Sequence, residues 1–253
     1  MRIQHWIILV AMFCSTALAQ QPSSATGTGR YDTDIQAKVT KLLSSKDKWK
    51  NITATTDDAI VTLEGSVNIY IDKLDAGRKV DKISHVDGVR NHVKVESSAS
   101  DADLQSKLAD KLRYDRVGFG NAFNAPTLKV ENGVVTVGGD MRDYTSRDSA
   151  LAIVETTPGV KDVIDEINVL PASPFDDDIR LRVARAIYGA PALKRYAIDP
   201  QKPIRIIVEN GNVTLYGVVS TQLDKQLAES QARGVPNVFS VKNELVVAGK
   251  NTK

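Results

Sequence analysis

The chain has 253 residues, and its 33 lysines and arginines nearly balance its 31 aspartates and glutamates. A formal net charge of +2 at pH 7 argues against a protein that binds nucleic acid through bulk charge. The one cysteine, Cys14, lies in the N-terminal leader considered next. The rest of the chain therefore offers no disulfide, no thiolate nucleophile and no zinc–thiolate site.

The first segment, MRIQHWIILVAMFCSTALAQQ, predicts a secretory signal peptide. Arg2 supplies a basic start, and the apolar run that follows is shorter than the ~20 residues that span a bilayer. The tripeptide ending at Ala19 has the small–x–small form that signal peptidase reads. We therefore expect residues 1–19 to be removed after Ala19 and the mature protein to be periplasmic. Residues 20–30 contain no core-forming side chain and are expected to be disordered.

A five-residue phrase then occurs three times, as VTLEG ending at Gly65, VTVGG ending at Gly139 and VTLYG ending at Gly217. The glycines are 74 and 78 residues apart, which is too long for a solenoid repeat and typical of three small domains. We expect the domains to span, in chain order, 31–98, 101–172 and 175–248, with a tail over 249–253.

Each copy predicts five elements in the same order. The first is an amphipathic helix with an acidic start, and we expect its aspartates to cap the helix. A strand, a tight turn and a second strand follow. The turns are Asn132-Gly133 in copy two, Asn210-Gly211 in copy three and, as a poorer turn, Asp58-Ala59 in copy one. A second helix, expected at about 69–84, 144–156 and 221–233, leads into the last strand.

This order predicts an α+β fold made of three tandem small two-layer sandwiches. Each is α-β-β-α-β, with two helices on one face of a three-stranded mixed sheet. We expect separate cores that share no residues, each of modest stability because each is small. Copy one should be the least stable, since it lacks the Asn-Gly turn, has a last strand shorter by two residues and carries Gly77 in its second helix.

These elements resemble the BON domain family. The resemblance rests on the phrases GVVTVGG and NGNVTLYG, and on the glycine–valine pairs that begin with Gly88 and Gly159 before the last strand. Copy three departs from this pattern with Asn237. The resemblance covers about 31–248. It implies a periplasmic, non-catalytic module that binds phospholipid or envelope surfaces, in envelope maintenance or osmotic stress.

Residue types used for catalysis and metal binding are sparse. Copy one holds His85 and His92, and we assign His92 to the strand position of Val163 and Val241 in the other copies. A packed strand histidine is the favoured interpretation, and a metal site is weakly supported. No Ser–His–acid set recurs between copies, and GFGN at 118–121 lacks the flanking strand and lysine of a phosphate loop. We expect no enzyme activity, no cofactor and no metal.

Two features predict a contact with anionic phospholipid. Trp49 lies among lysines in KDKWK, which is typical of a membrane interface, although it is more readily explained as a plug of its own core. The second feature is a basic cluster with interleaved tyrosines in copy three, whose alternative is a solvated helix face with local ion pairs. The cluster contains Arg182, Arg185, Tyr188, Lys194, Arg195 and Tyr196.

The sequence thus predicts an exported, non-catalytic protein that binds envelope surfaces, above all anionic phospholipid. The alternative is a periplasmic adaptor or chaperone that binds envelope proteins through sheet edges or helix faces, and exposed apolar patches would favour it. The oligomeric state is not determined by the sequence.

Overall fold

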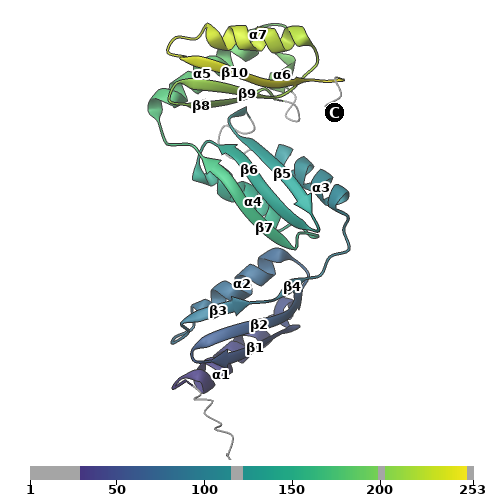
Figure 1. The fold of residues 1–253 in the computed structure, drawn as a ribbon, viewed down its shortest axis with the longest axis vertical. Helices are drawn as coiled ribbons and strands as arrows, with labels where there is room; N and C mark the ends of the chain where they lie inside the picture. The colour runs from purple at the N-terminus through teal and green to yellow at the C-terminus, as the bar shows by residue number, and fades with distance from the viewer. Residues whose placement is uncertain (1–28, 115–121, 199–202, 250–253) are drawn as a thin grey trace, which may run out of the picture.

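The structure is a computed structural model that describes residues 29–114, 122–198 and 203–249. The predicted signal peptide and the GFGN segment lie outside the described residues. Three units follow one another along the long axis of the molecule (Figure 1). Within the ranges that the structure describes, no helix has both the length and the apolar character needed to cross a membrane.

The secondary-structure elements follow the predicted order in all three units. Domain 1 contains α1 (Asp32–Ser44), the short 3-10 helix η1 (Asp47–Trp49), β1 (Ile52–Asp57), β2 (Ile60–Val67), α2 (Tyr70–Asp81), β3 (Gly88–Asn91) and β4 (Lys94–Val95). Domain 2 contains α3 (Asp101–Tyr114), β5 (Ala125–Glu131), β6 (Val134–Met141), α4 (Tyr144–Glu155) and β7 (Asp162–Val169). Domain 3 contains α5 (Pro174–Gly189), α6 (Arg195–Ile198), β8 (Arg205–Glu209), β9 (Asn212–Val219), α7 (Gln222–Arg233) and β10 (Ser240–Val247).

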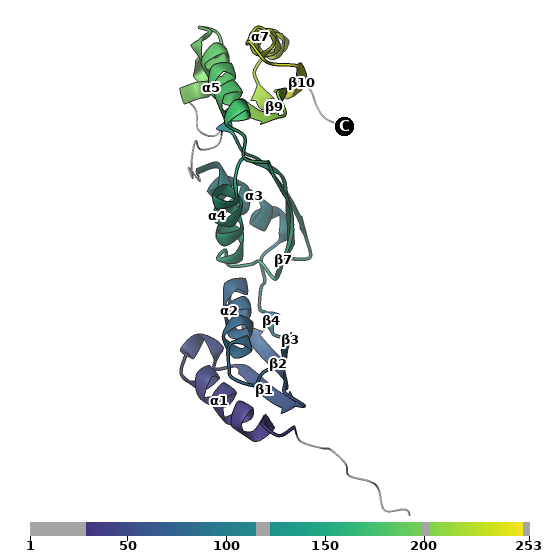
Figure 2. The same ribbon diagram turned by 90° about the vertical axis from the view of Figure 1, so that its left-hand side faces the viewer.

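The second strand of each unit lies at the centre of its sheet. β2, β6 and β9 each pair antiparallel with the strand before them and parallel with the last strand. Figure 2 shows the helices of domains 1 and 2 in one layer and their strands in the other. The predicted fold of three two-layer α+β sandwiches with mixed sheets is therefore confirmed.

The last strand of domain 1 is interrupted, and β3 and β4 together hold two strand residues fewer than the 8 of β7 or β10, as predicted. β3 and β4 continue one parallel register along β2, from Gly88 opposite Ile60 to Val95 opposite Val67. This register covers the full length of β2. Only the stretch around His92 leaves the regular strand.

The register also corrects the assignment of His92. Val89, Val163 and Val241 occupy corresponding positions, opposite the first valine of each repeated phrase. His92 lies further along the strand, and its backbone N–H donates to the carbonyl of Leu63 at 2.8 Å.

The glycine that ends each repeated phrase is required by a close backbone approach. Gly65, Gly139 and Gly217 have φ of 112°, 88° and 128°, a region that side chains disfavour. A Cβ atom at Gly65 or Gly139 would lie 2.0 Å or 2.1 Å from a carbonyl oxygen of the chain entering the first strand. At Gly217 the corresponding distance is 2.6 Å. The glycine recurs because the backbone before or at the start of the first strand approaches the central strand closely at this point.

A second recurring position precedes the last strand. His85, Gly159 and Asn237 each lie three residues before that strand and have φ of 73°, 110° and 71°. The counterpart of Gly159 is thus His85 and not Gly88, which corrects the alignment of the glycine–valine pairs. The His85 ring stacks on Tyr31 with centroids 3.9 Å apart.

The hairpin turns have the same geometry in all three domains. Both central residues have positive φ at Asp58-Ala59, Asn132-Gly133 and Asn210-Gly211. Domain 1 therefore makes the same turn as the others, but it places an alanine at φ 61° where they have glycine. A Cβ atom in this region adds strain, so Ala59 remains a weakness of domain 1.

The acidic residue at the start of each first helix holds this turn. Asp176 accepts hydrogen bonds from the backbone N–H groups of Asn210 and Gly211 at 3.0 Å and 2.8 Å. Asp101 does the same in domain 2 and Asp32 in domain 1. These carboxylates tie the first helix to the hairpin. Asp176 was expected to cap α5, and that prediction was wrong because its carboxylate holds the turn instead. In α5 the cap is Ser173, which accepts from the N–H of Asp176.

Gly77 leaves room for a packing contact within domain 1. Its backbone lies inside α2, but an added Cβ would lie 2.8 Å from Nδ2 of Asn91. That amide donates to the carbonyl of Lys73 at 2.8 Å and so joins the last strand to α2. The expected cost of a helical glycine is therefore offset by a contact that alanine would disturb.

The hydrophobic cores are not separate. One cluster of buried residues contains Trp49 and Val61 of domain 1 together with Leu104 and Val135 of domain 2. Phe123, from the segment before β5, joins the core cluster of domain 3. The expectation that the cores share no residues was therefore wrong, because apolar side chains at the junctions continue each core into the next.

Candidate functional site

The first aromatic predicted to contact lipid, Trp49, lies in the core of domain 1. Its side chain is 0% exposed, and its indole N–H donates to the carbonyl of Asp72 in the first turn of α2 at 3.0 Å. The ammonium group of Lys48 lies 5.1 Å from the ring centroid and 2.8 Å from the Asp72 carboxylate. Trp49 therefore plugs the segment between α1 and β1 against α2.

Tyr196 makes the corresponding plug in domain 3. It is 5% exposed, and its hydroxyl donates to the carboxylate of Asp224 in the first turn of α7 at 2.9 Å. The same hydroxyl accepts from the N–H of Ser220 at 2.7 Å. The Arg195 guanidinium lies 5.2 Å from the Tyr196 ring centroid and pairs with Asp224.

The hydrogen bonds around Asp224 favour the ionised form of its carboxyl group. Burial by itself raises the pKa of the carboxyl. Hydrogen bonds from Thr221, Tyr196 and Arg195 outweigh this effect and hold the pKa of Asp224 below its usual value. Asp224 is therefore charged at neutral pH and neutralises Arg195.

The three aromatic side chains that were predicted to contact lipid, Trp49, Tyr188 and Tyr196, thus point into their own domains. Trp49 and Tyr196 are buried, and the Tyr188 hydroxyl donates to the carbonyl of Ile204 at 2.5 Å. Burial also raises the pKa of Tyr188, so its hydroxyl stays neutral. The hypothesis that these rings enter a headgroup layer is corrected, because each ring fills its own domain.

The predicted cations divide into paired and unpaired groups. Arg182 forms an i,i+4 ion pair with Asp178, and Arg195 pairs with Asp224. Arg185 and Lys194 are exposed, and neither has an acidic partner within the ranges that the structure describes. These two residues carry the uncompensated positive charge of the predicted cluster.

Exposed apolar side chains lie at the end of domain 3 where β9 ends and α7 begins. Leu223 is 71% exposed, and Val218 and Val246, which are register partners on β9 and β10, are each 44% exposed. The Arg195–Asp224 ion pair joins this end to the basic segment that follows α5. Arg185 lies on α5, whereas Val218 and Val246 lie on the outer face of the sheet. We call these three residues, together with Lys194 and Leu223, the domain 3 tip.

The apolar members of the domain 3 tip were not predicted from the sequence. One signal was present for Leu223, since the buried positions of α7 are Asp224, Ala228 and Ala232, and a leucine one residue earlier falls off this stripe. Val218 lies on a strand whose alternate residues face the core, but sequence alone does not show which outer face stays uncovered.

The arrangement suits surface contact better than chemistry. Among the described residues, no three His, Cys, Asp or Glu side chains are grouped so that they could hold a metal ion. Unpaired cations and exposed aliphatic side chains are the features with which proteins bind an anionic interface.

Comparison with known proteins adds a family and one curated relative. The model of the BON domain matches residues 31–97, 100–171 and 176–249. Osmotically-inducible protein Y of Escherichia coli (strain K12) is 26% identical over 173 residues, which cover 67% of this chain and 80% of that protein.

Two solved structures match the chain at low identity. CdsD, a structural protein of the type III secretion system of Chlamydia trachomatis, is 14% identical with a TM-score of 0.24, covering 85% of this chain and 92% of that one. The C-terminal domain of CdsD has the same identity and a TM-score of 0.23, covering 85% of this chain and 97% of that one. Scores this low do not establish a common arrangement.

Proposed function

Since the chain belongs to the BON domain family, we propose that it is an exported, stress-related envelope protein that binds anionic phospholipid through the domain 3 tip, without catalysis. The name of the Escherichia coli relative, osmotically-inducible protein Y, supports the stress-related part. The leader ending at Ala19 supports export to the periplasm.

The observation that carries the lipid proposal is the pairing state of the cations. Arg182 and Arg195 already have carboxylate partners, whereas Arg185 and Lys194 have none among the described residues. An exposed cation without an acid partner is attracted to an anionic headgroup by ~1 kcal/mol near the surface. Leu223 adds an exposed aliphatic group that can enter the boundary between headgroups and acyl chains.

The contact is expected to be weak and peripheral. Two unpaired cations and a few aliphatic side chains supply only a small part of the energy that anchors a protein stably. Because both cations are exposed, added salt screens them, and binding should weaken as ionic strength rises.

Co-sedimentation of the mature chain with vesicles tests the proposal. Binding is expected to phosphatidylcholine vesicles that contain phosphatidylglycerol and not to pure phosphatidylcholine. The double variant Arg185→Glu, Lys194→Glu should lower the affinity at least ~10-fold at low salt, because four units of charge change near the surface. The matched control is Lys79→Glu, Lys82→Glu, which makes the same charge change on exposed residues at the end of α2.

Equal binding by the two double variants would refute the domain 3 tip as the contact. If the wild type binds neither vesicle, the lipid proposal is wrong, and the alternative of a periplasmic adaptor or chaperone that binds proteins is favoured. Trp49 is an internal reporter, because a buried ring in domain 1 should keep its emission when domain 3 binds the vesicle.

A further inference from the structure

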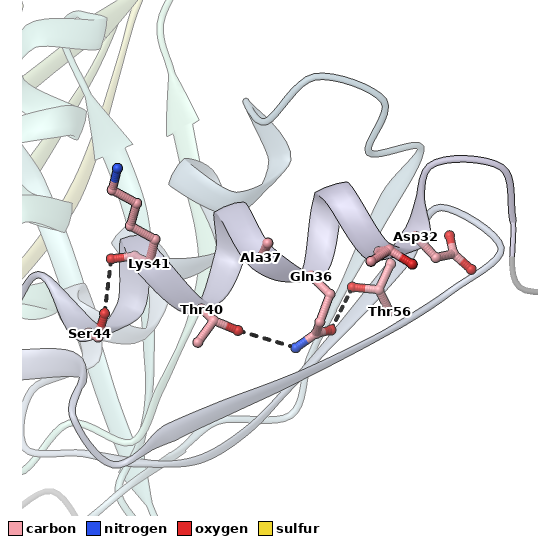
Figure 3. A pocket seen from close by; sticks show the side chains of 8 residues that line it. Asp32, Gln36, Ala37, Thr40, Lys41, Ser44 and Thr56 are labelled. Atoms are coloured by element: carbon pink, nitrogen blue, oxygen red, sulfur yellow. Dashed lines mark hydrogen bonds between the residues drawn. The ribbon is translucent and has the colours of Figure 1, made fainter.

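An open groove runs beside the first strand of domain 1. Its hollow of about 710 Å³ lies between α1 and β1, and a second hollow of about 280 Å³ continues it past Trp49. Figure 3 shows α1 along one side, with Gln36 reaching across to Thr56 on β1. The lining side chains are small or neutral apart from those at its ends; they include Ala37, Thr40, Ser44 and Thr56.

The wall formed by β1 is an edge strand, and no other strand of the described residues pairs with its outer side. The Ala54 carbonyl accepts from the side-chain amide of Gln36 at 2.9 Å, so it points away from β2. Because edge-facing groups alternate along a strand, the N–H and C=O groups of Ile52 and Thr56 face the same way. A second strand can therefore pair with β1 along this edge.

β1 lacks the devices that normally protect an edge strand. Its sequence, ITATTD, has no charge before the last residue and no proline. By contrast, β5 carries Pro126 and Lys129, β10 carries Lys242 and Glu244, and β7 carries three acidic residues. An unprotected edge beside a groove is typical of a strand that pairs with another chain.

The corresponding edge in domain 3 is closed. Arg180 occupies the position that corresponds to Gln36, since each lies four residues after the aspartate that holds the hairpin turn, Asp176 or Asp32. Arg180 is 2% exposed. Its guanidinium donates to the carbonyl of Val208 on β8 at 2.6 Å. Ile207 on the same strand is buried in a cluster with residues of domain 2. The open edge is therefore a property of domain 1.

The charges at the two ends of the groove are self-complementary. Lys41 and Lys50 lie at one end, and the exposed Asp57 and Asp58 lie at the other. A two-fold rotation brings the basic end of one copy onto the acidic end of another. Antiparallel pairing centred on Ala54 would place Lys50 opposite Asp58 of the second copy.

We propose that this groove binds a second copy of the chain, with β1 pairing antiparallel to β1 about a two-fold axis centred on Ala54. Two three-stranded sheets then become one continuous sheet, and the small side chains of α1 allow the two copies of α1 to approach. Gln36 competes with the second copy, since its amide occupies the Ala54 carbonyl in the monomer. One edge strand and one helix face make a small interface, so the dimer is weak and reversible.

Sedimentation velocity of the mature chain over a range of concentrations, without lipid, tests this proposal independently of the vesicle experiment. The wild type should show a concentration-dependent dimer. Thr56→Lys should weaken it at least ~10-fold, because a charge would be buried in the groove. The matched control is Thr55→Lys, one residue away on the outer face, which should change the dissociation constant less than ~2-fold.

Two further variants guard against a folding defect. Lys50→Glu changes an exposed residue and should also weaken the dimer, since it would face Asp58 of the second copy. Gln36→Ala should strengthen the dimer by removing the competing donor. The Trp49 emission reports whether each variant keeps its core.

A monomer at every concentration, for both the wild type and Gln36→Ala, would overturn the proposal. Equal effects of Thr56→Lys and Thr55→Lys on a dimer would overturn it too, because association would then not involve the groove. Binding of an extended peptide in the groove of a strictly monomeric chain would assign this edge to a different occupant.

Discussion

The link between Asp176 and the hairpin of domain 3 should be a major source of that domain's stability. Its carboxylate is 3% exposed and accepts two backbone hydrogen bonds, of 3.0 Å and 2.8 Å. Hydrogen bonds to a charged group contribute about 1.5–3 kcal/mol each, and a buried N–H left without an acceptor costs about 1–3 kcal/mol. In a variant without the Asp176 carboxylate, water can reach the N–H of the exposed residue Asn210, which lowers the cost of losing that acceptor. We therefore expect Asp176→Ala to lower the free energy of unfolding by about 3 kcal/mol.

The matched control is Asp178→Ala, two residues along the same helix. Asp178 is exposed, and its ion-pair partner among the described residues is Arg182, so its removal should cost less than ~0.5 kcal/mol. Differential scanning calorimetry should show the melting of domain 3 about 12–24 °C lower in Asp176→Ala, at roughly 4–8 °C per kcal/mol for a domain of this size. Hydrogen exchange should become faster at Asn210 and Gly211.

Similar melting temperatures for the two variants would refute this reasoning. Unchanged exchange at the turn amides would refute it as well, since these N–H groups would then not depend on the carboxylate. Asp101→Ala should reproduce the effect in domain 2, because its carboxylate makes the same two bonds.

Two more predictions concern domain 1 and its junction with domain 2. Ala59→Gly should raise the stability of domain 1 by up to ~1 kcal/mol in a Trp49 fluorescence melt, because glycine removes the strain of a Cβ at φ 61°; an unchanged or lower melting point would mean that packing of the methyl group outweighs the strain. Burial, and more weakly the charge of Asp75, raise the pKa of Glu155 above its usual value, while Arg78 opposes this. A raised folded-state pKa favours the protonated form, so the stabilising contribution is present at acid pH and is lost as pH rises through the folded-state pKa. Glu155→Gln should therefore raise the stability measured by urea unfolding at pH 7 relative to pH 4, and an equal effect at both pH values would contradict this.

Much of the architecture could be read from the sequence because it depends on local pattern. The spacing of the phrases ending at Gly65, Gly139 and Gly217 indicates three units, and the Asn-Gly turns indicate a hairpin in two of them. Periodicity then places a helix on each side of the hairpin. These signals can be recognised without the structure because they depend on neighbours in the chain, and so the α+β fold was predicted correctly.

The candidate site was predicted less well, because a side chain's role depends on what packs against it. Trp49 and Tyr196 look in the sequence like aromatic residues beside cations, but contacts with α2 and α7 bury both rings. The same folding leaves Leu223 exposed at the domain 3 tip. Which cations have partners is likewise decided by residues distant in the chain, as the pair between Arg195 and Asp224 shows.

The sequence by itself determined the order and type of the five main elements of each unit, since local periodicity, turn residues and repeat spacing suffice for these; it did not predict the short helices η1 and α6. Only the tertiary structure decided that Asp32, Asp101 and Asp176 hold the hairpin turns, and that cores expected to be separate are continuous. The physical reason is that a hydrogen bond or an apolar contact between distant residues has no period along the chain. It exists only once the sheet register and the helix positions bring the two partners together.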